Sequence, residues 1–176
     1  MNNQTKLNGW TQPILDILFE LFNEHAADEN TKVVILTGSD PYYCAGTNLF
    51  ETIKPMHPKK LYRMITESNA KLFNYFIDFP KLFLVAANGP AIGASVTSAA
   101  LCDGIIASHK ASFLTPFARL AVPAEGCSSV HFQCILGTES AHKMIGEGWK
   151  VYAEEAKEIG LILQVVTHNR SWLKAG

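Results

Sequence analysis

A glycine-containing segment, Asn88-Gly-Pro-Ala-Ile-Gly-Ala-Ser95, most constrains the fold of this chain. It joins an apolar run at 81–87, typical of a strand, to small residues at 94–102 that suit a closely packed helix. Gly89 and Gly93 can adopt backbone angles that are closed to residues with a Cβ atom. The segment therefore predicts a corner at which a strand turns directly into a helix.

This corner allows two interpretations. The first N–H groups of a helix lack intrahelical acceptors and lie at its positive end, so they can bind an anion or a developing oxyanion. Alternatively, the glycines serve only a tight turn made for close packing. The Gly89-x-x-x-Gly93 spacing matches neither the GxGxxG pattern nor the P-loop, so this segment alone leaves both interpretations open.

Strand-like and helix-like segments alternate along the rest of the chain. This alternation predicts an α/β fold with largely parallel strands, because each crossover is long enough for a helix. Apolar positions expected in the core are Ile14, Leu15, Leu18, Leu21, Phe22, Leu61, Ile65, Leu72 and Phe76. The expected strands are 32–37, 81–87, 104–108, 111–113 and 161–166; the expected helices are 11–25, 58–80, 94–102, 125–136, 139–147 and 153–159; and loops are expected at 42–55 and 114–124.

The composition narrows the classes of protein to consider. With 176 residues, of which 48% are hydrophobic, the chain predicts a single domain, 1–176, with its core at about 7–166. The net charge of −1 gives no reason to expect nucleic acid as a partner. The four cysteines form no CxxC pair and the six histidines no HExxH motif, so no metal site is expected. No apolar run approaches the roughly 20 residues that a membrane span needs.

Five motifs resemble, in residues and in order, the enoyl-CoA hydratase/isomerase (crotonase) superfamily. The resemblance is strongest to its Δ3,Δ2-enoyl-CoA isomerase branch, of the peroxisomal type. It implies the ClpP/crotonase fold, a spiral of ββα repeats, here expected to be incomplete at both ends. The motifs are Lys32-Val-Val-Ile-Leu-Thr-Gly38 with Tyr43-Cys-Ala-Gly-Thr-Asn-Leu49, Asn88-Gly-Pro-Ala-Ile-Gly-Ala94, Cys102-Asp103, Ala111-Ser-Phe-Leu-Thr-Pro116 and Pro123-Ala-Glu-Gly-Cys-Ser-Ser129.

The resemblance gives the two glycine-containing segments a joint role. In this superfamily the thioester oxygen of an acyl-CoA lies between two backbone N–H groups, which by motif position belong here to Thr47 and Ala94. Coenzyme A is then part of the substrate, and no other cofactor is implied. The resemblance assigns substrate binding to Ala45, Gly46, Thr47, Asn48, Leu49, Gly93 and Ala94.

The resemblance also points to one catalytic carboxylate, Glu125. The two glutamates of the hydratases are replaced by Thr97 and Phe117, neither of which can move a proton. One carboxylate suffices for a 1,3-proton shift. Taken alone, Glu125 could instead be a first-turn acid that complements a helix dipole. An apolar pocket would raise its pKa and a helix N-terminus would lower it, and the sequence leaves open which effect is larger.

The implied activity moves a 3-cis or 3-trans double bond of an acyl-CoA to the 2-trans position in unsaturated fatty-acid β-oxidation. One alternative is an inactive module that binds acyl-CoA or a protein partner. A weaker one is a thioester hydrolase, since Gly93-Ala-Ser95 begins like a nucleophile elbow. The family is trimeric and works in peroxisomes or mitochondria; we expect the peroxisome, although the chain shows no targeting signal.

The surface around Glu125 is expected to be apolar and uncovered. A few hundred Å² of such surface is worth several kcal/mol at ~25 cal/mol per Å². We therefore expect the chain either to self-associate or to be marginally stable. Tyr42 and Tyr43 are expected to be loop aromatics that shield the site. The expected apolar surface comprises Phe117, Leu120, Val122, Phe132 and Ile135.

Overall fold

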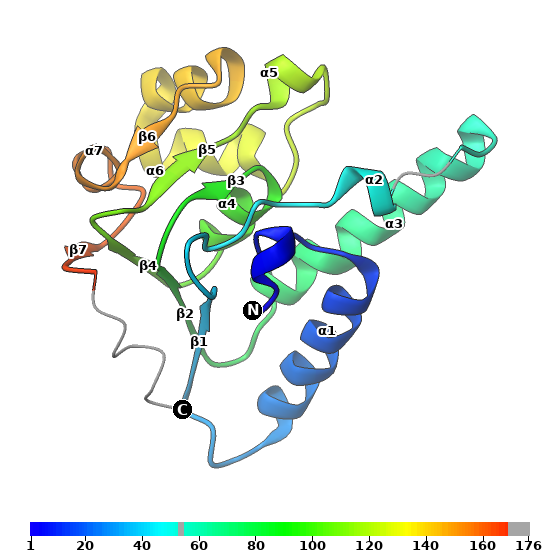
Figure 1. Ribbon diagram of the computed structural model, residues 1–176, viewed down its shortest axis with the longest axis horizontal. Helices are drawn as coiled ribbons and strands as arrows, with labels where there is room; N and C mark the ends of the chain where they lie inside the picture. The colour runs from blue at the N-terminus through cyan, green and yellow to red at the C-terminus, as the bar shows by residue number, and fades with distance from the viewer. Residues whose placement is uncertain (53–54, 169–176) are drawn as a thin grey trace.

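The computed structural model describes residues 1–52 and 55–168 and shows an α/β architecture (Figure 1). Its larger sheet contains four parallel strands in the order β1-β2-β4-β7. A smaller sheet has the order β3-β5-β6, with β3 parallel and β6 antiparallel to β5. The strands are β1 (Val33–Thr37), β2 (Leu82–Ala87), β3 (Ala91–Ile92), β4 (Gly104–Ser108), β5 (Ser112–Leu114), β6 (Val151–Tyr152) and β7 (Gln164–Val166).

The helices follow the expected order, with some changes of boundary. The segments expected as loops at 42–55 and 114–124 each contain a short helix, and β6 was not expected at all. Gly137, with φ of 77°, breaks α6 where a helix end was predicted. The helical elements are η1 (Gln4–Lys6), α1 (Gln12–Ala27), α2 (Leu49–Thr52), α3 (Pro58–Ile77), α4 (Ala94–Ala99), α5 (Phe117–Leu120), α6 (Ser128–His142), the π-helix η2 (Lys143–Glu147) and α7 (Ala153–Glu158).

Two boundary predictions were wrong for physical reasons. Helix α6 begins at Ser128 rather than at Glu125, because Cys127 adopts a left-handed φ of 59° that a helix does not allow. Strand β7 begins at Gln164 rather than at residue 161, because the N–H groups of Leu161 and Ile162 donate to the Ala156 carbonyl and not to a neighbouring strand.

Helices α1 and α3 pack an aromatic cluster against the sheet. Phe22 of α1 lies 5.5 Å from Phe76 of α3 and 5.3 Å from Phe83 of β2, measured between ring centroids. Such edge-to-face pairs are favourable beyond the area they bury. Leu21 and Ile65, expected in the core, are instead exposed. The first half of α3, which carries Ile65, projects away from the body of the molecule (Figure 1).

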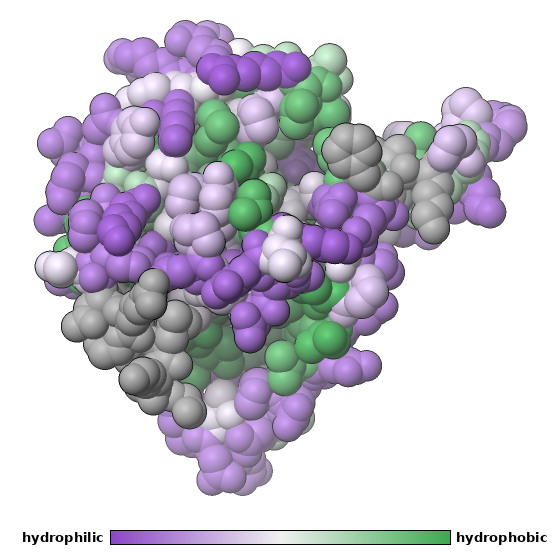
Figure 2. All heavy atoms as spheres, viewed as in Figure 1, coloured by the Kyte–Doolittle hydropathy of each residue, from purple (hydrophilic) through white to green (hydrophobic). Residues whose placement is uncertain are grey.

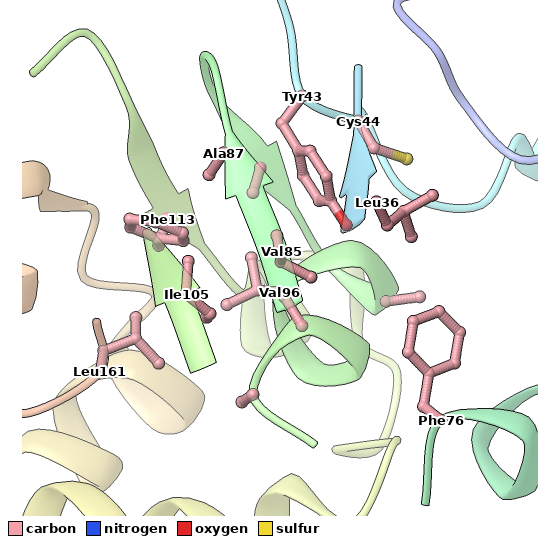
Figure 3. Close-up of a cluster of buried hydrophobic side chains, with 14 of the residues drawn as sticks. Leu36, Tyr43, Cys44, Phe76, Val85, Ala87, Val96, Ile105, Phe113 and Leu161 are labelled. Atoms are coloured by element: carbon pink, nitrogen blue, oxygen red, sulfur yellow. The ribbon is translucent and has the colours of Figure 1, made fainter. Parts of the chain in front are cut away.

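One face of the large sheet forms the centre of the core. Val85 and Ile105 point from β2 and β4 toward Val96 of α4, and all three are buried (Figure 3). Alternate residues of the strands lie on the opposite face, where Val33 and Ile35 are exposed. This alternation is typical of a sheet with one covered face.

The apolar surface expected near Glu125 is smaller than predicted. Phe117 and Phe132 are buried, whereas Leu120, Val122 and Ile135 are exposed. Figure 2 shows hydrophobic side chains gathered on the surface over α5 and the segment after it. Self-association and marginal stability stay predictions, as does the assignment of 1–176 to one domain.

Tyr43 was expected to shield the site, but it is completely buried in the core (Figure 3). Its hydroxyl is the one buried side-chain N or O atom of the described residues that has no hydrogen-bond partner. Burial raises the pKa of this phenol well above its usual value. An unpaired buried hydroxyl typically costs about 1–3 kcal/mol of stability, so the hydroxyl of Tyr43 destabilises the folded protein.

Candidate active site

The two glycine-containing segments lie side by side. Cys44 forms a parallel bridge with Ala91, in which the Ile92 N–H donates to the Cys44 carbonyl over 3.0 Å. A Cβ atom added to Gly46 would lie 2.4 Å from the Ile92 carbonyl oxygen and 3.7 Å from the Ala94 nitrogen. Only glycine allows this approach, which brings the segment around Thr47 next to the start of α4.

The structure leaves both predicted donor N–H groups available. Thr47 lies in a parallel bridge with Trp10 that uses the Gly46 carbonyl and the Asn48 N–H, so its own N–H is left for the other side of the strand. Ala94 is the first residue of α4, directly after Gly93 with φ of 61°. Within the part of the chain that the structure describes, neither the Thr47 nor the Ala94 N–H donates to another residue.

Ser95 holds the two segments together. Its hydroxyl accepts a hydrogen bond from the Ile92 N–H over 2.9 Å and donates to the Cys44 carbonyl over 2.9 Å. The residue is completely buried. A hydroxyl bound to the backbone on both sides is a structural tie, and this arrangement gives no support to a nucleophilic Ser95.

Glu125 is placed beside α4 by the turn that precedes α6. Its carbonyl accepts hydrogen bonds from the Ser128 hydroxyl over 2.6 Å and from the Ser128 N–H over 3.1 Å. A Cβ atom on the next residue, Gly126, would lie 2.5 Å from Thr97 Oγ1 and 2.6 Å from Phe73 Cε1. Because Thr97 follows Ala94 by about one helical turn, these contacts bring Glu125 close to the donor end of α4.

The surroundings of Glu125 answer the question that its sequence left open. Burial raises the pKa of the Glu125 carboxyl above its usual value, and a hydrogen bond from Asn69 partly opposes this rise. Asn69 Nδ2 donates to Glu125 Oε2 over 3.2 Å. Glu125 precedes α6 and is not in its first turn, so the interpretation as a first-turn acid that complements the helix dipole is wrong. Desolvation is therefore the dominant effect on this carboxyl.

The other residues singled out in the sequence are buried, form local hydrogen bonds or lie at the surface. Thr97 is buried and its hydroxyl donates to the Ala94 carbonyl over 3.2 Å, while Phe117 is buried. Asn48 Oδ1 accepts from the Glu51 N–H over 3.3 Å, a local bond at the start of α2. Ala45 is half-buried, and Leu49 is exposed as the first residue of α2.

Replacing Asn69 with Ala is expected to move the acidic limb of the pH–turnover profile to higher pH. The Asn69 amide stabilises the ionised carboxylate, so the pKa of Glu125 rises when this bond is lost, and the carboxyl stays protonated up to a higher pH. Initial rates measured across pH would show the shift. Asn74→Ala changes an exposed amide on the same helix and should leave the limb in place. An unmoved limb in Asn69→Ala would contradict the assignment of Asn69.

Comparison with known proteins agrees with this arrangement. Residues 1–174 match the family model described as enoyl-CoA hydratase/isomerase. The chain belongs to this family.

Within residues 1–52 and 55–168, no group of three or more His, Cys, Asp or Glu side chains is placed to hold a metal ion. No helix among the described residues has the length and apolar composition to cross a membrane.

Proteins named as enoyl-CoA delta isomerases are similar in sequence to this chain. Enoyl-CoA delta isomerase 3, peroxisomal, of Mus musculus is 37% identical over 166 residues, which are 93% of this chain and 52% of that protein. Enoyl-CoA delta isomerase 2 of Rattus norvegicus is 36% identical over 168 residues, covering 93% of this chain and 42% of that protein. The chain thus spans about half the length of these relatives.

Two further similarities bear on fold and function. Chromodomain Y-like protein of Homo sapiens is 36% identical over 142 residues, 80% of this chain and 24% of that protein. The crystal structure of an enoyl-CoA hydratase from Bacillus anthracis superposes with a TM-score of 0.88 at 26% identity, covering 98% of this chain and 67% of that chain. The family and the crotonase fold predicted from the sequence are confirmed, whereas the roles of individual site residues stay predictions.

Proposed function

We propose that this chain carries the site of a Δ3,Δ2-enoyl-CoA isomerase, with Glu125 as its base. The observation that supports this most is the half-buried Glu125 carboxylate, with a raised pKa, beside the donor end of α4. The positions at which the hydratases carry two acids hold Thr97 and Phe117, which have no ionisable group. Similarity to two enoyl-CoA delta isomerases agrees with this choice within the family.

The mechanism follows from the placement of these groups. The thioester oxygen of a 3-enoyl-CoA would accept hydrogen bonds from the N–H groups of Thr47 and Ala94. Glu125 would take a proton from C2, and the C–H electron pair would form a dienolate whose negative charge is shared between the thioester oxygen and C4. Glu125 would then return the proton at C4, leaving the double bond at C2. The reaction has no net oxidation, so coenzyme A enters only as part of the substrate.

The two backbone donors would act where negative charge develops. An oxyanion-hole donor of this kind is worth about 3–4 kcal/mol of transition-state stabilisation. The raised pKa of Glu125 supports both halves of the shuttle, because a carboxyl group near its pKa both accepts and returns a proton readily.

A second candidate is a domain that binds acyl-CoA or a protein partner without turnover. The 36% identity to the chromodomain Y-like protein favours it. A peroxisomal location is proposed for the isomerase, since one relative bears that word in its name. Imaging the full-length protein in cells would test the location.

One assay separates these functions. Purified protein is incubated with 3-cis and 3-trans enoyl-CoAs of several chain lengths, and 2-enoyl-CoA, 3-hydroxyacyl-CoA and free thiol are measured together. We expect 2-trans-enoyl-CoA alone. Acyl-CoA binding without any product would support the binding domain, and free coenzyme A would support the hydrolase. Hydroxyacyl-CoA would show that water addition had been wrongly excluded.

A further inference from the structure

Polar side chains connect the carboxyl ends of all four strands of the large sheet. Asp40 lies after β1, Asn88 directly follows β2, Ser108 ends β4, and His168 lies after β7. The carboxyl ends of parallel strands share one edge of the sheet, so these four residues approach the same edge. We call them the strand-end network.

The network is continuous from β1 to β7. Asn88 Nδ2 donates to Asp40 Oδ1 over 3.1 Å, and His168 Nε2 lies 3.2 Å from Asp40 Oδ2. His168 Nδ1 lies 3.0 Å from the Ser108 hydroxyl oxygen. The tautomer with its proton on Nε2 satisfies both contacts, because Nε2 then donates to Asp40 and Nδ1 accepts from the Ser108 hydroxyl. The His168 and Asp40 side chains are only 14% and 22% exposed, which restricts their motion.

The same network contacts both segments that carry the proposed donors. Asn88 Oδ1 accepts from the Gly38 N–H over 3.1 Å, and Asn88 Nδ2 donates to the Tyr42 carbonyl over 3.2 Å. A Cβ atom on Gly89 would lie 2.1 Å from the Pro41 carbonyl oxygen. The turn that contains Asp40 leads to Thr47, and Asn88 begins the segment that leads to Ala94. The network therefore holds in place the residues at which both segments begin.

The three residues Ser108, His168 and Asp40 have the composition of a hydrolytic triad, but the surroundings of Ser108 favour another role. Ser108 is only 6% exposed, and its hydroxyl oxygen also accepts from the Lys110 N–H over 3.2 Å. A nucleophile must reach a substrate, whereas this hydroxyl is enclosed by its own chain. Ser108 acts here as an anchor for the imidazole.

We propose that His168 is a positioning residue for the two backbone donors, an inference that rests on the proposed isomerase function. It joins Asp40, after β1, to the end of β4 and to the segment after β7. Since β1 and β7 are at opposite edges of the sheet, this contact spans its full width. Loss of His168 would release one side of the turn at Asp40 and let the Thr47 segment shift relative to Ala94.

The test compares His168→Ala with His168→Gln in the protein that carries this chain. Misplacing a reacting group by about 1 Å can cost up to ~100-fold in rate, so a partial release in His168→Ala should lower kcat about tenfold. KM for 3-enoyl-CoA should change by less than about twofold, because the two N–H groups would act mainly in the transition state. A Gln amide can still donate to Asp40, so His168→Gln should recover most of kcat.

A matched histidine at the other end of the sheet gives the control. His25 Nδ1 lies 3.3 Å from the Thr31 hydroxyl oxygen, near the end of α1 and before β1. His25→Ala should lower the melting temperature without changing kcat. If His168→Ala behaves in the same way, with kcat unchanged well below its melting temperature, His168 is merely structural and the proposal is overturned.

A second readout separates this proposal from the proposed function. Acetoacetyl-CoA serves as the probe, because its enolate absorbs in the near ultraviolet and carries negative charge on the thioester oxygen. Wild type should stabilise this enolate, and His168→Ala should lose most of the signal while still binding the probe. If wild type isomerises nothing but stabilises the enolate, the isomerase assignment fails. The comparison of wild type with His168→Ala then still decides whether His168 positions the two backbone donors. Wild type that does neither overturns both proposals.

Discussion

Replacing Glu125 with Gln is expected to lower the turnover of 3-enoyl-CoA by about 10²–10⁴-fold, the usual contribution of a positioned acid–base group. Gln keeps the shape of the side chain, and its amide oxygen can still accept from Asn69. It cannot take a proton from C2. Acyl-CoA affinity, measured by calorimetry, should stay close to that of wild type.

Glu139→Gln is the matched control, because Glu139 is an exposed acid on α6 that pairs with Lys143 over 2.6 Å. Exposed pairs of this kind contribute little, so turnover and melting temperature should both be nearly unchanged. Wild-type turnover in Glu125→Gln would show that another group is the base.

Replacing Gly46 with Ala is expected to reduce turnover by about 10²–10³-fold, the effect of losing one oxyanion-hole donor. The added Cβ atom would lie 2.4 Å from the Ile92 carbonyl oxygen, a backbone atom that cannot move aside cheaply. Gly46 also has φ of 80°, which disfavours any residue with a side chain. The Thr47 N–H should therefore shift away from Ala94, and kcat measured well below the melting temperature would report it.

Gly160→Ala is the control that separates backbone strain at a positive φ from displacement of the Thr47 segment. Gly160 has a similar φ of 82°, but the nearest atom to its added Cβ, the Ile135 carbonyl oxygen, lies 3.3 Å away. This variant should lose stability and keep its turnover. Equal losses of stability with full turnover in both variants would refute the assigned role of the Thr47 segment.

The strands and long helices could be predicted because their apolar residues recur over many positions. The strand 104–108 is reproduced as predicted, and β2 differs by one residue. Elements of two to four residues, such as β6 and α5, are too short to show a period. The start of α6 depends on the left-handed backbone of Cys127, and no property of cysteine indicates this conformation.

Motif order located Glu125 and the two donor segments, but not the residues that hold them. Asn69 is separated from Glu125 by 56 positions, and His168 from Asp40 by 128. These contacts exist only once helices and strand ends are packed. The pKa of Glu125 could not be predicted either, because it depends on burial and on the hydrogen bond from Asn69.

The projecting half of α3 has a consequence for the acid strength of Glu125. The buried residues of this helix, Leu72, Phe73 and Phe76, lie in its second half. The first turns have few neighbours, so they can fray and re-form at small cost in free energy. Asn69 stands three positions before Leu72, the first of these buried residues. Fraying that reaches Asn69 would briefly remove the hydrogen bond to Glu125 and make the carboxyl a weaker acid, so opening of this helix end would change the proton affinity of the proposed base.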